Sequence, residues 1–171
     1  MPRDLALGNL NHTPLGDLRL VVSDLGLVAV EWAAAQPDLD RFLRRLARPV
    51  IEDQERVAPY AKQVFEYLTA QRRDFTFAID WSVLRPFQRM VLEAVCAVPY
   101  GETSTYAEIA ARIGRPNTYR AVGRANATNP MPLVIPCHRL IGADGKLHGY
   151  GGGDGLPTKE WLLQLEGALL A

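Results

Sequence analysis

The residue types best suited to covalent chemistry lie together in segment 129–139, which reads NPMPLVIPCHR. Its three prolines disfavour a helix, so we expect the apolar run between them to be extended and buried, delivering Cys137 at its end. A thiol is a strong nucleophile only as the thiolate, and the adjacent imidazole of His138 and nearby arginines favour that form. The segment therefore predicts a nucleophilic Cys137 that His138 activates, with a downstream carboxylate to orient the ring.

Two other interpretations of this segment stay open. Cys137 and His138 could form a purely structural pair, or they could join His148 as three ligands of a metal ion. Adjacent residues seldom converge on one metal and no fourth ligand is evident, so we expect no metal. The third histidine, His12, is expected in an N-terminal tail.

Cysteine usage points away from a secreted protein. The chain has only two cysteines, Cys96 and Cys137, too few for a disulfide framework and without zinc-finger spacing. Free cysteine behaves as a small hydrophobe, so Cys96, which falls inside an expected helix, is expected to be a plain core residue. The sequence shows no leader pattern and no apolar run of roughly 18 residues. We therefore expect a soluble, cytoplasmic protein.

Two short helices are expected just before the cysteine segment. Thr105 and Glu108 form a capping-box pattern that opens a helix, and Gly114 closes it. Asn117 is a suitable N-cap for a second helix over 118–127. Two short helices joined by a short glycine-containing connection are typical of a helix-turn-helix.

Charge gives these helices a candidate partner. The chain is neutral overall, with 19 basic and 19 acidic residues, yet residues 112–139 contain five arginines and no Asp or Glu. Arg120 and Arg124 are four residues apart and share one face of the second helix. An ordinary solvated helix face is the alternative, but a concentrated basic patch on such a helix favours DNA binding.

The N-terminal half has a different pattern from the rest of the chain. Alternating apolar residues flank a turn at 24–26, and helical spacing follows. The expected elements are a hairpin from 18–23 and 27–32, helices near 39–46 and 57–68, and a strand at 75–79.

The chain length suits one domain or two small ones. It has 171 residues, of which 48% are hydrophobic, enough for a compact core. The composition changes between 80 and 86, and from Pro86 the apolar spacing predicts a helix with one buried face. We therefore expect an α/β domain over 1–82 and a mainly α domain over 83–171.

Four short motifs in order resemble one known family. They are RAVG at 120–123, NP at 129–130, PCHR at 136–139 and GYGG at 149–152. Together they are similar to the O6-alkylguanine-DNA alkyltransferases, closely over 86–170 and more weakly before it. The resemblance implies a ribonuclease-H-like N-terminal domain and a winged-helix-like C-terminal domain that carries the helix-turn-helix.

The same resemblance implies a suicide DNA-repair activity, that of a single-turnover methylated-DNA–protein-cysteine methyltransferase. Such a protein binds duplex DNA, flips out O6-alkylguanine and transfers the alkyl group irreversibly to its own cysteine. O6-methylguanine is the main expected lesion, and O4-methylthymine stays open. No cofactor is expected, and the protein is expected to be a monomer, with cooperative assembly on DNA left open.

The resemblance also implies roles for residues around the thiol. Cys137 accepts the alkyl group, His138 acts through a water as its base, and Glu166 polarises His138. Asn129 ties the helix pair to the cysteine segment.

Further implied roles concern the substrate. Tyr106 hydrogen-bonds a guanine ring nitrogen, and Lys159 assists proton delivery to the leaving oxygen. The backbone carbonyls of Cys137 and Leu140 accept from the exocyclic amine. The glycine-rich segment 149–155 is implied to form a mobile wall of the alkyl pocket, with Gly149, Tyr150 and Gly151.

The implied DNA contacts come from the second helix and the turn before it. Arg120 corresponds to an arginine finger that fills the space left by the flipped base, while the helix lies in the minor groove. The other residues implied to contact DNA are Arg115, Asn117, Thr118, Tyr119 and Arg124.

Overall fold

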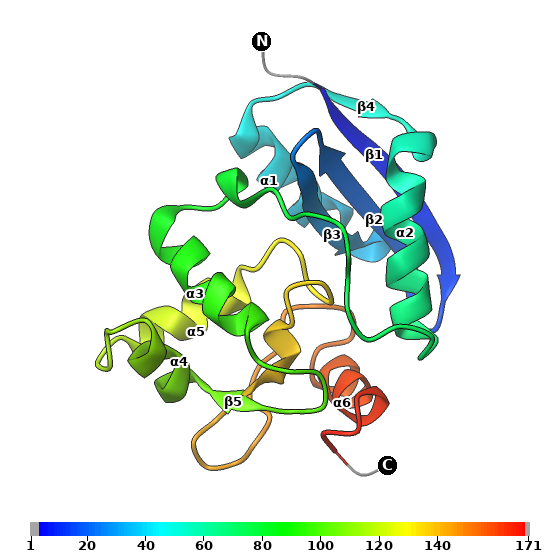
Figure 1. Cartoon of the computed structure of the whole chain (residues 1–171). Helices are drawn as coiled ribbons and strands as arrows, with labels where there is room; N and C mark the ends of the chain where they lie inside the picture. Colours follow the sequence, from blue (N-terminus) through cyan, green and yellow to red (C-terminus); the bar gives the residue numbers. More distant parts are fainter. Residues whose placement is uncertain (1–3, 170–171) are drawn as a thin grey trace. The chain divides into compact units, whose positions relative to one another are not determined.

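The computed structural model describes residues 4–169. The chain divides into two compact units, Met1–Val83 and Leu84–Ala171 (Figure 1). Within the described residues no helix is both long enough and apolar enough to cross a lipid bilayer.

A four-stranded sheet forms the frame of the N-terminal unit (Figure 1). Three strands form an antiparallel meander, and the last pairs parallel to the first. In the spatial order β3-β2-β1-β4, the strands are β3 (Gly26–Trp32), β2 (Gly16–Ser23), β1 (Leu5–Thr13) and β4 (Val50–Glu52).

Helices α1 (Gln36–Leu46) and α2 (Gln54–Leu68) complete the core of this unit. Helix α2 packs on β1 and β2, and this close approach needs a glycine on the strand. A Cβ atom on Gly8 would lie only 2.7 Å from the Cβ of Val57. Two short 3-10 helices, η1 (Ala33–Ala35) and η2 (Trp81–Val83), connect the regular elements.

The N-terminal predictions are confirmed for the hairpin and for both helices, but two others are wrong. His12 does not lie in a tail, because it belongs to β1, at the irregular pairing between Leu10 and Thr13. The expected strand at 75–79 is absent from the described chain apart from one isolated bridge between Leu27 and Ile79. The alternating aromatic residues there pack on Tyr60 and Tyr67 of α2, and the residues between them are exposed to solvent.

The C-terminal unit is mainly helical and contains one short parallel pair of strands. Helices α3, α4 and α5 pack against one another, and η3 lies against α3 and α6. The elements are α3 (Pro86–Cys96), β5 (Ser104–Thr105), α4 (Tyr106–Arg112), α5 (Tyr119–Ala127), η3 (Cys137–Arg139), β6 (Leu140–Ile141) and α6 (Leu156–Leu165).

The predictions of α3 and of the capping box on α4 are confirmed. Asn117 is not the N-cap of α5. That position belongs to Thr118, whose hydroxyl donates backwards to the carbonyl of Arg115 at 2.7 Å instead of capping the helix. Cys96 is exposed in the last turn of α3 and is therefore not a core residue.

The apolar run before Cys137 is buried as expected, but it is not extended. The amide of Ile135 donates to the carbonyl of Met131 at 2.9 Å, and Leu133 adopts φ of 74°. The prolines exclude a helix but permit this tight turn, which lets several apolar side chains enter the core within a short length of chain.

Candidate active site

Cys137 is held at the start of η3 by a short chain of hydrogen bonds. Its amide donates to the carbonyl of Ile135 at 2.7 Å. The Asn129 side chain donates to that same carbonyl at 3.0 Å and accepts from the amide of Met131 at 2.9 Å. One amide side chain thus clamps both ends of the turn that presents the thiol, immediately after α5.

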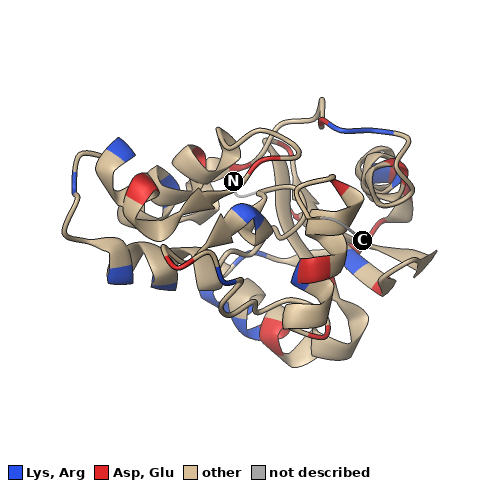
Figure 2. Cartoon of the chain, turned by 90° about the horizontal axis from the view of Figure 1, so that it is seen from below, with Lys and Arg blue, Asp and Glu red and all other residues tan. Residues whose placement is uncertain are grey.

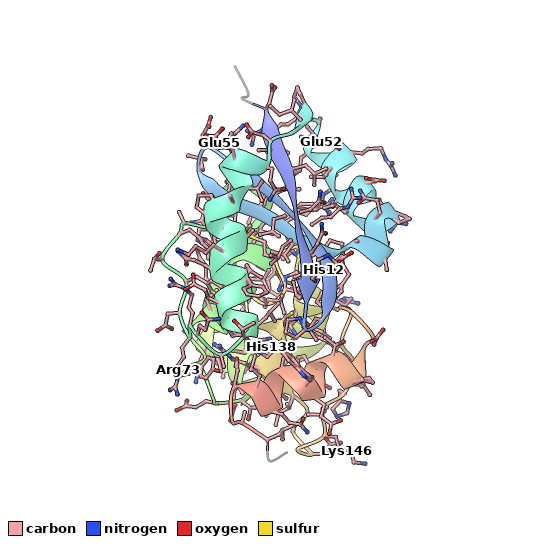
Figure 3. All side chains as sticks on the ribbon, turned by 90° about the vertical axis from the view of Figure 1, so that its right-hand side faces the viewer. His12, Glu52, Glu55, Arg73, His138 and Lys146 are labelled. Carbon is pink, nitrogen blue, oxygen red and sulfur yellow. The ribbon has the colours of Figure 1, made fainter. Side chains whose placement is uncertain are left out.

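His138, Arg139 and Glu166 form a buried ionic network beside the thiol. The His138 Nε2 lies 3.0 Å from the Glu166 Oε2, and the ring lies beside α6 (Figure 3). Arg139 donates to both oxygens of the same carboxylate, at 2.7 Å from Nε and 2.9 Å from Nη2. Its Nη1 also donates to the carbonyl of Val98 at 2.6 Å. A bidentate guanidinium thus fixes the carboxylate that faces the imidazole.

The protonation of this network follows from its surroundings. Burial raises the pKa of Glu166, but the hydrogen bonds and charges of His138 and Arg139 outweigh it and lower that pKa to about 2. Burial, opposed by Glu166, lowers the pKa of His138. At neutral pH the carboxylate is therefore ionised and the imidazole neutral. Since Nε2 faces a carboxylate, it carries the ring proton, and Nδ1 is the ring atom that can receive another.

The resting thiol is protonated. Burial raises the pKa of Cys137 above its ordinary value, while hydrogen bonds from Asn129 and Tyr150 and the charge of Lys159 act in the opposite direction. These three groups supply the partners that a thiolate needs at the moment it forms. The site therefore combines a protected resting state with groups that stabilise the reactive one.

Lys159 is buried on α6 and holds the backbone that follows the thiol. Its Nζ donates to the carbonyls of Leu140 and Leu147, each at 2.5 Å, and to that of Gly149 at 3.4 Å. Burial lowers the pKa of Lys159 to about 8, and the charge of Cys137 opposes this effect. The ammonium thus ties segment 140–149 to α6 while remaining electrostatically coupled to the thiol.

Two tyrosines lie near the acceptor. Tyr106 opens α4 and is half-buried, and burial followed by the charge of Cys137 raises its pKa. A Cβ atom on Gly123 would lie 3.8 Å from its ring, which places Tyr106 against α5. Tyr150 contributes a side-chain hydrogen bond to Cys137, and Gly151 next to it lies close to the end of α5, where a Cβ would meet the carbonyl of Ala127 at 3.4 Å.

The basic residues expected at DNA are exposed on α5 and on the loop before it. In Figure 2 blue positions gather on the left, where Figure 1 places α4, α5 and their connecting loop. The guanidinium of Arg120 lies 5.8 Å from the centre of the Tyr119 ring, which is 48% exposed. Arg115, Asn117 and Arg124 are exposed as well, and Thr118 is partly exposed.

The residues of the alternative metal site do not come together. Nε2 of His148 donates to Oδ1 of Asp144 at 2.9 Å within its own exposed loop. Across residues 4–169 no group of three or more His, Cys, Asp and Glu side chains could hold a metal ion.

Sequence reasoning did not assign roles to two residues that the structure places at the site. Arg139 was visible in the PCHR motif, but its partner Glu166 lies 27 residues away and no local pattern joins them. Asn126 is buried on α5 and donates from Nδ2 to the carbonyl of Cys137 at 3.1 Å. An asparagine on the inner face of an amphipathic helix was the only signal available for it.

Comparisons with known proteins identify relatives of this chain. Residues 86–168 match the family model described as 6-O-methylguanine DNA methyltransferase, DNA binding domain. A methylated-DNA–protein-cysteine methyltransferase of Methanosarcina barkeri is 39% identical over 157 residues, covering 91% of this chain and 93% of the relative. The protein of the same name from Salmonella typhimurium is 38% identical over 164 residues, covering 92% and 94%. The crystal structure of Mycobacterium tuberculosis OGT in complex with DNA matches with a TM-score of 0.78 and 33% identity, covering 95% of this chain and 93% of that one.

Proposed function

The chain belongs to the methylated-DNA–protein-cysteine methyltransferase family, and on that basis we propose that it repairs O6-alkylguanine in duplex DNA by transferring the alkyl group to Cys137. The main observation in support of Cys137 as the acceptor is that its buried thiol lies next to a neutral His138, whose Nε2 is 3.0 Å from Oε2 of Glu166. The reaction consumes the acceptor, so each molecule acts once and needs no cofactor.

The proposed transfer is a single displacement at the alkyl carbon. The thiol proton moves through a water to Nδ1 of His138, and the sulfur forms a bond to the carbon as the carbon–O6 bond breaks. The electron pair of that bond stays on the base, which takes up one proton and becomes guanine. Glu166 stabilises the imidazolium that forms in between, and Arg139 holds Glu166 in place.

Substrate contacts follow the same proposal. Tyr106 donates to a ring nitrogen of the base, which makes the base a better leaving group. Lys159 is proposed to favour the thiolate and proton return to the base through its charge, which its coupling to Cys137 supports. Tyr150, Gly149 and Gly151 line the alkyl group.

DNA contacts are proposed for α4 and α5, used as a helix-turn-helix within a winged-helix-like domain of 83–171, preceded by a ribonuclease-H-like domain of 1–82. The target carbon is inaccessible inside a duplex, so the lesion must leave the stack at a cost of a few kcal/mol. Arg120 is proposed to occupy the space it leaves, and the exposed positions Arg115, Asn117, Thr118, Tyr119 and Arg124 to contact the strand. The protein is proposed to act as a monomer inside the cell, where its DNA substrate lies.

Labelled DNA provides a direct test. Duplex DNA with a radiolabelled methyl group on O6-methylguanine should label the protein once per molecule, and peptide mapping should place the label on Cys137. The Cys137→Ala variant should bind DNA but take up no label, whereas Cys96→Ala should take up as much as the wild type. Label on Cys96, or repeated turnover, would refute the assignment.

A further inference from the structure

One row of residues along α5 stays open to solvent. Residues 119, 123 and 127 are four apart, so they follow one another along the same side of the helix. Tyr119 and Ala127 are exposed and Gly123 is partly exposed. The side chains that α5 buries are those of Val122, Ala125 and Asn126. We call Tyr119, Gly123 and Ala127 the open row.

The inner two members of the open row lie against the proposed substrate site. A Cβ atom on Gly123 would lie 3.8 Å from Cδ1 of Tyr106. A Cβ atom on Gly151 would lie 3.4 Å from the carbonyl oxygen of Ala127. Tyr106 and Gly151 are the residues proposed above to contact the base and its alkyl group. The open row therefore runs outward from the proposed base site, and Tyr119 is its outer member.

The length of the open row places Tyr119 near the neighbours of the lesion. Four residues of an α-helix rise about 6 Å, so Tyr119 lies about one turn beyond the point at which Gly123 meets Tyr106. Successive nucleotides of one strand are about 3.4 Å apart along the duplex axis. Tyr119 is therefore within reach of the nucleotides that flank the lesion when the lesion base lies beside Tyr106.

The side chain of Tyr119 is suited to stacking on a base. Its ring is 48% exposed, and the guanidinium of Arg120 lies 5.8 Å from the ring centre. Aromatic rings stack on any base, because every base has a π-face. Proteins that bind the minor groove also insert apolar side chains at base steps and so hold a distorted duplex open. A large exposed ring beside the proposed arginine finger thus offers a second surface to an opened base stack.

We propose that the ring of Tyr119 stacks on the nucleotide next to the flipped lesion while Arg120 fills the place that the lesion has left. Two adjacent side chains then hold the duplex open, and the ring contributes by its own contact with DNA and not only by orienting Arg120. The inference rests on the proposed function, since it concerns how the same protein exposes its substrate in duplex DNA.

Single-turnover rates at saturating protein test the role of the ring. They are measured with duplex O6-methylguanine and with free O6-benzylguanine, for wild type, Tyr119→Ala and Tyr119→Phe. Loss of one base–aromatic stack should slow the duplex reaction of Tyr119→Ala by about 5- to 150-fold. The rate with the free base should stay unchanged, because the free base needs no opening of a duplex. Tyr119→Phe keeps the ring and should react with both substrates like the wild type.

Two controls separate the ring from other effects. Phe65 on α2 is an aromatic residue of comparable exposure, 37%, so Phe65→Ala should keep the wild-type rates. Combining Tyr119→Ala with Arg120→Ala tests whether the ring only orients the guanidinium. The double variant should react more slowly with the duplex than Arg120→Ala alone. Thermal unfolding checks each variant, and alanine at an exposed helical position should preserve the fold.

The outcomes distinguish stacking from simpler roles. A slower duplex reaction of Tyr119→Ala, wild-type rates of Tyr119→Phe and a further loss in the double variant support the inference. Equal weakening of binding to damaged and undamaged duplex, with an unchanged rate at saturation, would make Tyr119 an ordinary strand contact and overturn it. A faster duplex reaction of Tyr119→Ala, or equal rates of the double variant and Arg120→Ala, would overturn it as well. Absence of transfer to Cys137 from both substrates in the wild type would instead refute the proposed function itself.

Discussion

Replacing Glu166 with glutamine isolates the contribution of the buried network to folding. In the wild type one carboxylate accepts from Nε and Nη2 of Arg139, at 2.7 and 2.9 Å, and faces His138 at 3.0 Å. Glutamine offers one acceptor oxygen, and its amino group would face a donor of Arg139 or His138. The variant therefore leaves a buried guanidinium without its counter-charge.

The size of the effect follows from the pKa of Glu166. A carboxyl held at a pKa of about 2, against its ordinary value of 4.5, stabilises the folded state by about 3 kcal/mol at neutral pH. Because the pKa is lowered on folding, this stabilisation is complete above about pH 4.5 and is lost as the pH falls towards 2. About half of it is already gone at pH 3. Glu166→Gln should thus be about 3 kcal/mol less stable at pH 7, and the difference should shrink in acid.

Urea unfolding of both proteins at pH 7 and between pH 3 and 5 measures this difference. Glu160→Gln is the matched control, because Glu160 is an exposed glutamate on α6 and its loss should change stability by less than about 0.5 kcal/mol. Transfer to Cys137 by Glu166→Gln should also slow, by about 10²-fold, since His138 loses the group that favours its protonated form. Equal stability of the two glutamine variants at pH 7, or parallel pH profiles of wild type and Glu166→Gln, would refute the reasoning.

Three further predictions concern the DNA contacts and the segment that follows the thiol. Arg120→Ala should slow repair of duplex DNA while leaving the reaction with free O6-benzylguanine nearly unchanged, because the free base needs no flipping; a parallel fall of both rates would exclude the finger role. Arg124→Ala should weaken binding to damaged and undamaged duplex alike and reduce the salt dependence. Lys159→Met should speed amide hydrogen exchange across 140–149 and slow transfer from duplex DNA and from the free base alike, because the ammonium no longer holds the carbonyls of that segment. Lys146→Met, in the same loop, is the control and should change neither rate. Unchanged exchange in the Lys159 variant would contradict the bracing role of the ammonium.

Local sequence signals predicted the elements that are determined locally. The hairpin, α1, α2, α3 and the capping box follow from spacing and cap residues, and the structure contains them. The sequence did not predict strand β1, because apolar and polar residues do not alternate regularly in LALGNLNHT and Gly8 interrupts it. Gly8 is needed there because a larger side chain would collide with Val57 of α2. The alternation at 75–79 was real but reflects packing on a helix and not pairing in a sheet.

The candidate active site likewise combines residues that the sequence predicts with contacts that depend on the fold. The residues of PCHR were visible as a motif, and the burial of the run before them was predictable from its composition. The turned backbone was not, because it depends on the side chain of Asn129 closing over Ile135. Glu166, which faces both His138 and Arg139, lies at the end of α6, so only the family resemblance could assign it before the fold was known.

Burial of the acceptor also explains why the proposed transfer runs in one direction. Burial raises the pKa of Cys137, so the thiolate is the species that the surroundings penalise most. Alkylation replaces it with a neutral, apolar thioether, which the same surroundings accept at little cost. The energy that opposes formation of the thiolate is therefore recovered once the carbon is bound, and it opposes any return of the alkyl group. Groups that favour the thiolate, such as Lys159 and Tyr150, need only act while the sulfur carries charge.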